Sequence, residues 1–159
     1  RRPAVRFYNH MPAAAIRDLV GRKVWNSYFK FCVERNPWDR AVSCYFWRKQ
    51  EDPSRSLEEF IDHGGLELLK MRGRDVYRID GQVVVDFICR YEQLEEDLEK
   101  VRLQLGLPES IQLPHAKSTF RTDLRSSQEL LVPRHVQRIQ EEFADEIELL
   151  GYSRLLGGG

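Results

Sequence analysis

The fold is decided by residues 29–45, which read Phe29-Lys30-Phe31-Cys32-Val33-Glu34-Arg35-Asn36-Pro37-Trp38-Asp39-Arg40-Ala41-Val42-Ser43-Cys44-Tyr45. The segment 28–33 is apolar except for Lys30, which is the pattern of a strand buried on both faces in a parallel sheet covered by helices. Asn36 then provides a helix N-cap, and Pro37 suits the first helical position. A buried strand that leads directly into a helix predicts an α/β domain.

Apolar spacing and turn residues predict the elements on either side of this stretch. In the helix that starts at Pro37, apolar residues recur every three or four positions and form one stripe facing a core. Asp80-Gly81 is a strong two-residue hairpin signal, and Gly106 ends a helix that follows Tyr91. The other expected elements are a strand over residues 4–8, a helix over 12–20, a short helix over 57–63 that stops at Gly64-Gly65, hairpin arms over 75–87, and a long helix over 128–150 that begins or kinks at Pro133.

The composition is that of one folded globular domain covering residues 1–159. Hydrophobic residues make up 42% and charged residues 31%, which excludes a disordered or fibrous chain. The 25 basic and 25 acidic residues give a formal net charge of zero, so no global field attracts nucleic acid or an anionic membrane. We therefore expect no nucleic-acid partner, and any anion site must be local.

The cysteines and the chain ends bear on compartment and completeness. Cys32, Cys44 and Cys89 are an odd number without CxxC spacing, which favours buried thiols in a reducing, cytoplasmic compartment over a disulfide or zinc framework. The sequence contains no secretory signal and no apolar stretch near the ~20 residues that a membrane-spanning helix needs. It opens with Arg1-Arg2-Pro3, without Met, and ends in three glycines, which indicates an incomplete sequence.

Arg35 and Ser43 are candidates for a shared anion site. In open α/β sheets, ligands bind at the carboxyl ends of strands, and a helix N-terminus there offers free N–H groups and partial positive charge. Arg35 adds a planar donor fork suited to a phosphate, and Ser43 lies about two turns along the helix that follows. The alternative is that each arginine of the stretch pairs with the acidic residue beside it, and that Ser43 is merely solvated. Those pairs are Arg35–Glu34 and Arg40–Asp39.

The pattern Arg-Asn-Pro-x-x-Arg-x-x-Ser-x-Tyr after an apolar strand, from Arg35 to Tyr45, resembles the 3′-phosphate-binding motif of sulfotransferases. It is especially similar to the carbohydrate sulfotransferase branch of that family, and the likeness runs from about Phe7 to Tyr152. The resemblance implies an α/β fold with a three-layer parallel sheet of the P-loop/sulfotransferase type and a helix-rich C-terminal half. The other segments that carry it are Val85-Asp86-Phe87-Ile88-Cys89-Arg90-Tyr91-Glu92-Gln93-Leu94, Leu113-Pro114-His115 and Asp145-Glu146-Ile147-Glu148-Leu149-Leu150-Gly151-Tyr152.

The resemblance also implies a function. It implies transfer of a sulfuryl group from 3′-phosphoadenosine-5′-phosphosulfate to a hydroxyl acceptor, with a carbohydrate favoured by the branch, and it implies that Arg35 and Ser43 grip the donor's 3′-phosphate. His10 matches the position of a histidine in several carbohydrate sulfotransferases, just after the preceding strand. Its imidazole has a pKa suited to a general base near neutrality. The alternatives for His10 are capping of the helix after Pro12 or a hydrogen bond to a backbone carbonyl.

The remaining polar candidates lie in an irregular segment and at the other histidines. In the family, the loop that corresponds to this segment comes near the nucleotide end of the donor, so Lys117, Ser118 and Arg121 are further candidates for donor binding. A solvated loop is the alternative. His63 and His135 are interpreted as surface residues, and because no histidines have the spacing of a metal site, we predict no metal.

The sequence departs from the family at its start. Sulfotransferases normally begin with a strand and a loop bearing Lys and Ser or Thr, which cradles the 5′-phosphosulfate. No GxxxxGK[ST] loop occurs here, and only nine residues precede His10. We therefore expect an N-terminally truncated domain that lacks the first strand and the phosphate loop, so that the activity of this chain by itself stays open. A non-catalytic nucleotide-binding or protein-interaction module is the alternative function. A kinase-type phosphate-transfer fold shares the same sheet, but the Arg35–Ser43 pattern and the absent Walker loop argue against it.

Overall fold

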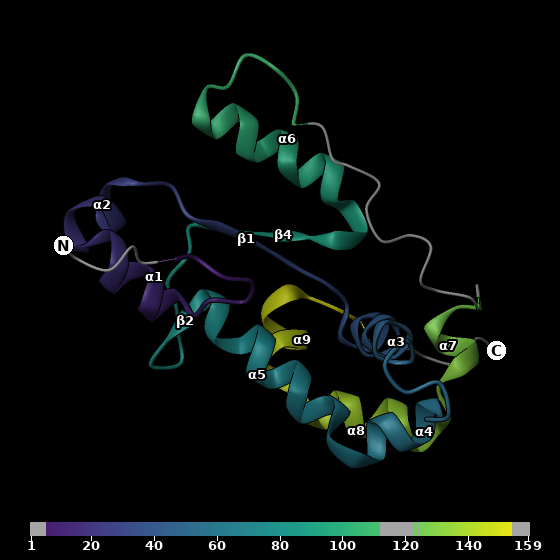
Figure 1. Cartoon of the computed structure of the whole chain (residues 1–159). Helices are drawn as coiled ribbons and strands as arrows, with labels where there is room; N and C mark the ends of the chain where they lie inside the picture. Colours follow the sequence, from purple (N-terminus) through teal and green to yellow (C-terminus); the bar gives the residue numbers. More distant parts are fainter. Residues whose placement is uncertain (1–5, 112–122, 124, 154–159) are drawn as a thin grey trace. The chain divides into compact units, whose positions relative to one another are not determined.

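The computed structural model describes residues 6–111, 123 and 125–153 (Figure 1). These residues divide into two compact units, each described by itself below. The elements in chain order are α1 (Ala13–Val20), α2 (Arg22–Ser27), β1 (Phe31–Glu34), α3 (Pro37–Arg48), α4 (Leu57–Phe60), the π-turn η1 (Ile61–Gly65), α5 (Leu66–Tyr77), β2 (Arg78–Ile79), β3 (Gln82–Val83), β4 (Phe87–Arg90), the 3-10 turn η2 (Tyr91–Gln93), α6 (Leu94–Leu105), α7 (Ser127–Leu130), α8 (Pro133–Glu142) and α9 (Ala144–Leu150).

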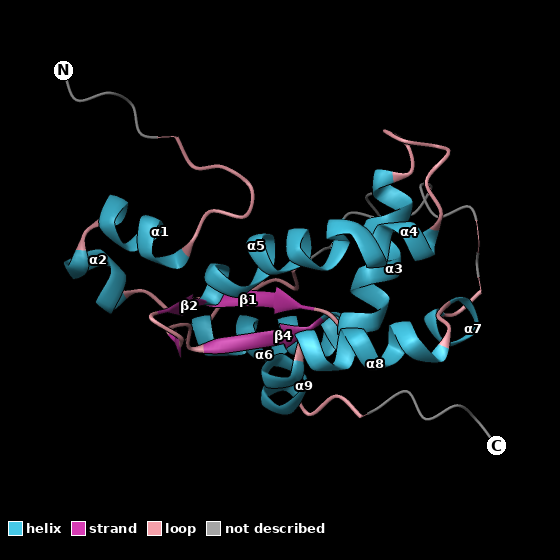
Figure 2. Ribbon diagram, turned by 90° about the horizontal axis from the view of Figure 1, so that it is seen from below, coloured by secondary structure: helices cyan, strands magenta, loops and turns pink. Residues whose placement is uncertain are grey.

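The first unit, residues 6–34, 70–89 and 93–111, contains a two-stranded sheet of β1 and β4. The two strands run side by side in the same direction in Figure 2. Just before them, the Asp86 carboxylate accepts from the Lys30 backbone N–H at 2.7 Å and pairs with the Lys30 ammonium at 2.8 Å. The hydrogen bond from this ammonium holds the pKa of Asp86 below its usual range. These contacts fix where the two strands begin relative to each other.

A small core lies within this unit. Its buried members are Cys89 of β4 and two residues of α6, Leu98 and Val101. The α6 helix confirms the prediction for the segment after Tyr91, and it ends at Gly106, whose φ of 64° is left-handed. Burial, with a further contribution from Glu34 and Cys89, raises the pKa of the Cys32 thiol to about 12, so this group stays protonated at neutral pH.

The strand predictions at the N-terminal end are only partly confirmed. β1 begins at Phe31, three residues later than predicted, and residues 22–27 form α2, which the sequence did not indicate. The predicted burial of this strand on both faces is wrong, since Phe31 is 41% and Val33 45% exposed. In the strand predicted over residues 4–8, residues 6–8 are not a strand, and residues 4 and 5 lie outside the described residues.

The Asp80-Gly81 hairpin is confirmed, with shorter arms than predicted. Arg78 pairs with Val83 and Ile79 with Gln82 in antiparallel register. Asp80 and Gly81 have positive φ values of 52° and 77°, as the two central residues of a type I′ hairpin turn require. Residues 75–77, which were assigned to the first arm, belong instead to α5.

The second unit, residues 35–69, 90–92 and the described residues from 123 onward, is built around α3. The predicted apolar stripe is confirmed, and its residues are all buried. Trp38 is fully buried, and its indole N–H donates to the Val136 carbonyl at 3.0 Å, so the polar atom of this large side chain is satisfied. The stripe consists of Trp38, Ala41, Val42, Tyr45 and Phe46, and it packs with Phe60, Ile61, Leu66, Leu69, Leu131, Ile139 and Phe143.

The helix predicted over 57–63 is broken earlier than expected. A capping box between Ser56 and Glu59 begins α4, which ends at Phe60, and η1 then turns the chain into α5. Gly64 lies in this turn with a φ of 89°. Gly65 is packed directly against Phe60, because a Cβ at Gly65 would lie 2.3 Å from the Phe60 carbonyl oxygen and 2.7 Å from the Phe60 ring. The glycine pair therefore links two helices rather than ending one.

The C-terminal half is helix-rich, as predicted, but the long helix expected over 128–150 is three helices. α7 ends at Leu130, and Pro133 takes the first position of α8. Phe143, with φ −121° and ψ 26°, interrupts the helical path between α8 and α9. Among the described residues, no helix has both the length and the apolar character needed to cross a bilayer. That residues 1–159 form a single domain stays a prediction.

The two glycines of the break give a first test. Alanine at Gly64 meets open space but must keep a positive φ, which costs about 1–2 kcal/mol. Gly65 has no positive φ, but alanine there forces its methyl group into the Phe60 carbonyl and ring, and such overpacking costs about 1–3 kcal/mol or more when backbone must move. We expect Gly65→Ala to lower the urea midpoint clearly more than Gly64→Ala. Equal midpoints would contradict the close packing described here.

Candidate anion-binding site

Arg35 lies where it was predicted, directly after β1 and before the N-cap of α3. Its guanidinium carbon is 4.6 Å from the centroid of the Tyr91 ring, so the side chain is held against an aromatic face. The Nε of Arg35 is buried and has no hydrogen-bond partner among the described residues. A buried donor without an acceptor is costly, and an anionic oxygen placed beside it would remove that cost.

The helix N-terminus itself does not offer the free N–H groups that the sequence predicted. The Asn36 side-chain oxygen accepts from the backbone N–H groups of Trp38 at 3.0 Å and Asp39 at 3.4 Å. The N–H of Asn36 donates to Glu92 at 2.7 Å, and Pro37 has none. The expectation of a backbone cradle is therefore wrong for this part of the helix, because the chain satisfies these donors itself. An anion here would have to be held by side chains.

Ser43 and Arg40 follow on α3, with different surroundings. Ser43 is half-buried and lies about 20° around the helix from Asn36, at 100° per residue. Arg40 forms a salt bridge of 2.6 Å with Glu146 and stacks on Phe143 at 4.9 Å, so its charge is engaged within the fold. The alternative pairing of Arg40 with Asp39 is replaced by this bridge to α9. That Arg35 and Ser43 reach one anion stays a prediction.

His10 lies in the first unit, whereas Arg35 and Ser43 lie in the second. Its backbone has a φ of 60°, and its Nδ1 lies 3.1 Å from the Arg72 carbonyl oxygen. Because a carbonyl only accepts, Nδ1 carries the proton and Nε2 keeps its lone pair in the neutral ring. The carbonyl contact is one of the two structural alternatives for this residue, and it also leaves a nitrogen that can act as a base. The strand that was expected to end before His10 is absent over residues 6–8.

The other predicted donor-binding residues cannot be placed. Lys117, Ser118 and Arg121 lie outside the described residues, as does His115. Among residues 6–111, 123 and 125–153, no group of three or more His, Cys, Asp or Glu side chains is arranged to hold a metal ion.

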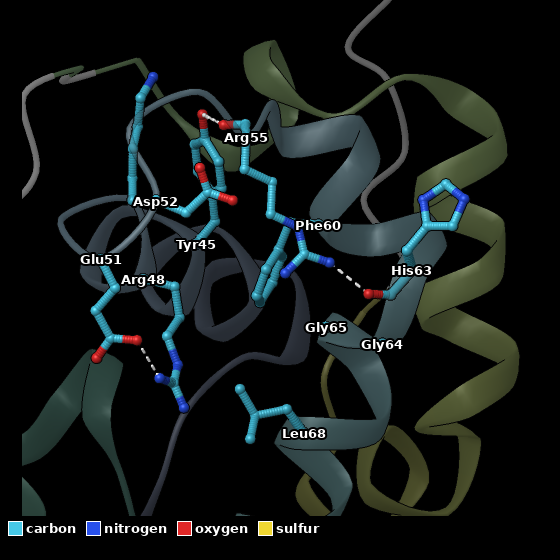
Figure 3. Close-up of a pocket in the computed structure, with 11 residues that line it drawn as sticks. Tyr45, Arg48, Glu51, Asp52, Arg55, Phe60, His63, Gly64, Gly65 and Leu68 are labelled. Carbon is cyan, nitrogen blue, oxygen red and sulfur yellow. Dashed lines mark hydrogen bonds and ion pairs between the residues drawn. The ribbon is translucent and has the colours of Figure 1, made fainter.

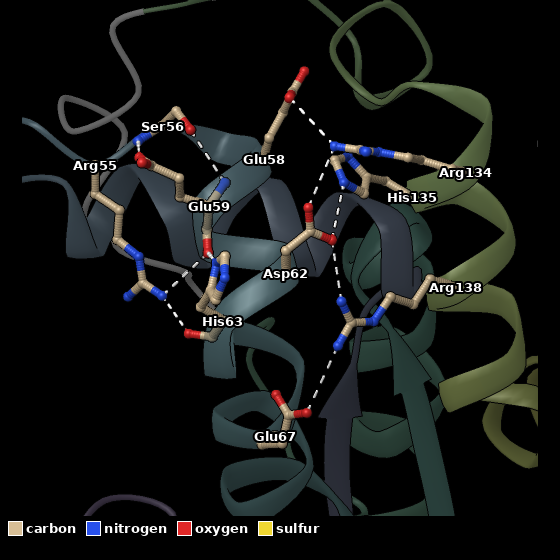
Figure 4. A network of polar contacts seen from close by, with 10 residues as sticks. All are labelled: Arg55, Ser56, Glu58, Glu59, Asp62, His63, Glu67, Arg134, His135 and Arg138. Atoms are coloured by element: carbon tan, nitrogen blue, oxygen red, sulfur yellow. Dashed lines mark hydrogen bonds and ion pairs between the residues drawn. The ribbon is translucent and has the colours of Figure 1, made fainter.

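His135 was interpreted as a surface residue, and this is wrong. It is 1% exposed, and its Nε2 lies 3.3 Å from an Asp62 carboxylate oxygen. Arg134 and Arg138 converge on the same carboxylate at 3.3 and 3.1 Å, as Figure 4 shows. Desolvation alone would raise the pKa of Asp62, but the His135 ring beside it and the cationic Arg134 and Arg138 lower it. This cluster connects α8 to the turn between α4 and α5. Its arginines are already paired with the Asp62 carboxylate.

A pocket of about 310 Å³ opens beside the Gly64-Gly65 break in the second unit (Figure 3). From α3, it is lined by Tyr45, Arg48 and Lys49, which lie about 140–240° around the helix from Ser43. It therefore faces away from Ser43 and the candidate anion site. The other lining residues are Glu51, Asp52, Arg55, Phe60, His63 and Leu68.

The charged groups of this pocket are already engaged with the protein. Arg48 pairs with Glu51, and Asp52 accepts from the Ser54 hydroxyl at 2.7 Å. Arg55 lies over Phe60, 5.4 Å from the ring centroid, and donates to the Glu59 carbonyl at 3.3 Å. The pocket is thus not a preformed anion site.

Comparison with known proteins now identifies the family. The profile of the sulfotransferase family matches residues 9–153. This chain belongs to the sulfotransferase family. It is also 42% identical over 105 residues to an uncharacterized protein of Archaeoglobus fulgidus, a match that covers 64% of this chain and 87% of that protein. No solved structure matches the chain significantly. Family membership supports sulfuryl transfer in general, and the mixed α/β structure with its small parallel sheet is consistent with this type of fold.

Two residues of the candidate site were missed by sequence reasoning. Tyr91 and Glu92 were read only as parts of the matching segment from Val85 to Leu94. In the structure both precede α6, which begins at Leu94. The Glu92 carboxylate accepts a hydrogen bond from the Asn36 backbone N–H. Glu92 is one of several acidic residues at positions 92–97, and nothing in the sequence distinguishes it from the others.

Arginines 35 and 40 should separate binding from stability. Arg40→Gln leaves the Glu146 carboxylate, whose side chain is 3% exposed, without its cation, and breaking such a buried pair costs about 3 kcal/mol. Arg35→Gln removes a stacking contact worth about 0.5–1 kcal/mol and a buried donor that has no acceptor. Urea unfolding should therefore show a large loss for Arg40→Gln and a small one for Arg35→Gln. The reverse order would contradict the roles assigned to the two side chains.

Proposed function

We propose that this sulfotransferase binds 3′-phosphoadenosine-5′-phosphosulfate through Arg35 and Ser43 and transfers its sulfuryl group to a hydroxyl of a carbohydrate. The proposal rests on the surroundings of the Arg35 side chain. Its guanidinium is fixed against Tyr91 at a strand-to-helix junction, and its buried Nε lacks an acceptor among the described residues. The 3′-phosphate would supply acceptor oxygens for this donor.

Side chains carry the proposed phosphate contact, since the first N–H groups of α3 are used by Asn36 and Glu92. The guanidinium of Arg35 offers charge and a planar pair of donors, and the Ser43 hydroxyl offers one further donor. The contact holds the departing nucleotide in place, so its contribution is to positioning rather than to bond breaking.

In the proposed reaction, the acceptor oxygen attacks the sulfur in line with the bond to the leaving nucleotide. The new bond joins that oxygen to sulfur, the old sulfur–oxygen bond breaks, and its electron pair leaves with adenosine 3′,5′-bisphosphate. The acceptor proton passes to Nε2 of His10, whose Nδ1 proton is held by the Arg72 carbonyl. This tautomer supports the proposed role of His10 as general base.

Donor binding can be tested without any acceptor. By calorimetry with adenosine 3′,5′-bisphosphate, Arg35→Ala and Ser43→Ala should each weaken binding about 10- to 100-fold, since a hydrogen bond to a charged group contributes roughly 1.5–3 kcal/mol. Arg48→Ala is the matched control, because Arg48 lies on the same helix but on the opposite side from Ser43. This variant should bind adenosine 3′,5′-bisphosphate with the wild-type affinity. Wild-type affinity in Arg35→Ala would refute the proposed site.

His10 is tested by transfer. His10→Ala should leave bisphosphate affinity unchanged and lower the turnover of sulfuryl transfer by about 10²- to 10⁴-fold, the usual contribution of a general base. The assay uses radiolabelled donor with carbohydrate, tyrosine-peptide and small-alcohol acceptors. Near-normal transfer in the variant would exclude His10 as the base. Bisphosphate binding by the wild type without transfer to any acceptor would favour the non-catalytic nucleotide-binding module.

A further inference from the structure

Glu92 occupies an unexpected place for a carboxylate, next to a proposed phosphate site. One of its oxygens accepts from the Asn36 backbone N–H at 2.7 Å, and the other accepts from the Tyr152 hydroxyl at 2.8 Å. All three residues belong to the second unit. A negative charge near a bound anion is unfavourable. Its presence here therefore calls for a compensating role, and its two hydrogen bonds indicate which one.

The segment Tyr91-Glu92 holds Arg35 at both of its ends. Glu92 fixes the peptide N–H of Asn36, the residue directly after Arg35, and so limits the backbone from which the Arg35 side chain extends. The Tyr91 ring fixes the other end, where the guanidinium carbon lies 4.6 Å from the ring centroid. The two contacts come from adjacent residues of one 3-10 turn, so a displacement of that turn would alter both. A change in Glu92 would thus be transmitted to both ends of Arg35.

Tyr152 anchors this arrangement from a distant part of the sequence. Gly151 ends α9 in a left-handed conformation with φ 65°, and the Tyr152 N–H donates to the Ile147 carbonyl at 3.0 Å. This cap directs the residue after the helix and brings the Tyr152 hydroxyl to Glu92. The end of α9 is therefore connected to Asn36 through a single carboxylate.

We propose that Glu92 is a positioning residue that sets Arg35 for the donor's 3′-phosphate, with Tyr152 holding Glu92 in place. This inference rests on the function proposed above. Glu92 touches no substrate in this role and acts only through Arg35. What it determines is the preference of the site for a nucleotide with a 3′-phosphate over the same nucleotide without one.

The experiment measures that preference. Calorimetry gives the dissociation constants of adenosine 3′,5′-bisphosphate and adenosine 5′-monophosphate, and their ratio reports the 3′-phosphate contact alone. Glu92→Ala should weaken bisphosphate binding on the order of tenfold, equivalent to about 1.4 kcal/mol, and leave the monophosphate constant unchanged. Glu92→Gln should retain the wild-type ratio, because its amide oxygen can accept from Asn36 and its amide N–H can donate to the Tyr152 oxygen. Tyr152→Phe should reduce the ratio a few-fold.

Glu59→Ala is the matched control. The Glu59 carboxylate likewise accepts from the backbone N–H of an N-cap residue, Ser56, at 2.8 Å, and it lies in the same unit. Its loss removes the same kind of bond from α4, so stability falls while the nucleotide ratio should stay at the wild-type value. This variant separates a general loss of stability from a loss of Arg35 positioning.

The possible results are distinguishable. If the wild type binds neither nucleotide, or both equally, the proposed function fails before Glu92 is tested. If the wild type prefers the bisphosphate and Glu92→Ala keeps that preference, or loses both affinities equally, the positioning role is overturned while the function stands. A ratio in Glu92→Gln as low as in Glu92→Ala also overturns it. Should Glu92→Ala fail to fold, Tyr152→Phe decides, and an unchanged ratio in that variant refutes the inference.

Discussion

The second unit depends on the way the chain turns from residue 35 into α3. Asn36 satisfies two N–H groups of the first helical turn with its side chain, and its own N–H is satisfied by Glu92. Trp38, two residues later, then enters the core fully buried. If this start were displaced by one residue, the apolar stripe of α3 would rotate by about 100° and leave the core. The same start fixes Arg35, so the packing of the unit and the candidate site share one determinant.

Several elements were predictable because their cause is local. The Asn36-Pro37 start, the Asp80-Gly81 turn and the Gly106 stop each follow from the conformational preference of one or two residues. The stripe of α3 followed from its spacing. The start and side-chain exposure of β1 were not predictable in the same way, because an apolar run does not show which of its residues will pair or what will cover them. Likewise, the backbone break at Phe143 carries no proline or glycine to mark it.

The residues of the candidate site also differ in whether the sequence could predict them. Arg35 and Ser43 were indicated by a motif of adjacent residues, whereas the partners of the site come from far along the chain. Tyr91 and Glu92 reach Arg35 and Asn36 across more than fifty residues of sequence, and Tyr152 reaches Glu92 across sixty. The burial of His135 depends on Asp62 in a similar way. Contacts of this kind depend on tertiary packing, and a single sequence read by itself gives no sign of them.

The cap of α3 also bears on how far the candidate site can be altered. Because Asn36 and Glu92 already accept from the first N–H groups of this helix start, no ligand is needed to satisfy them. The scaffold can therefore tolerate drift in its ligand-contacting side chains without losing its architecture. An engineer could therefore replace side chains of the candidate site while leaving the start of the helix intact.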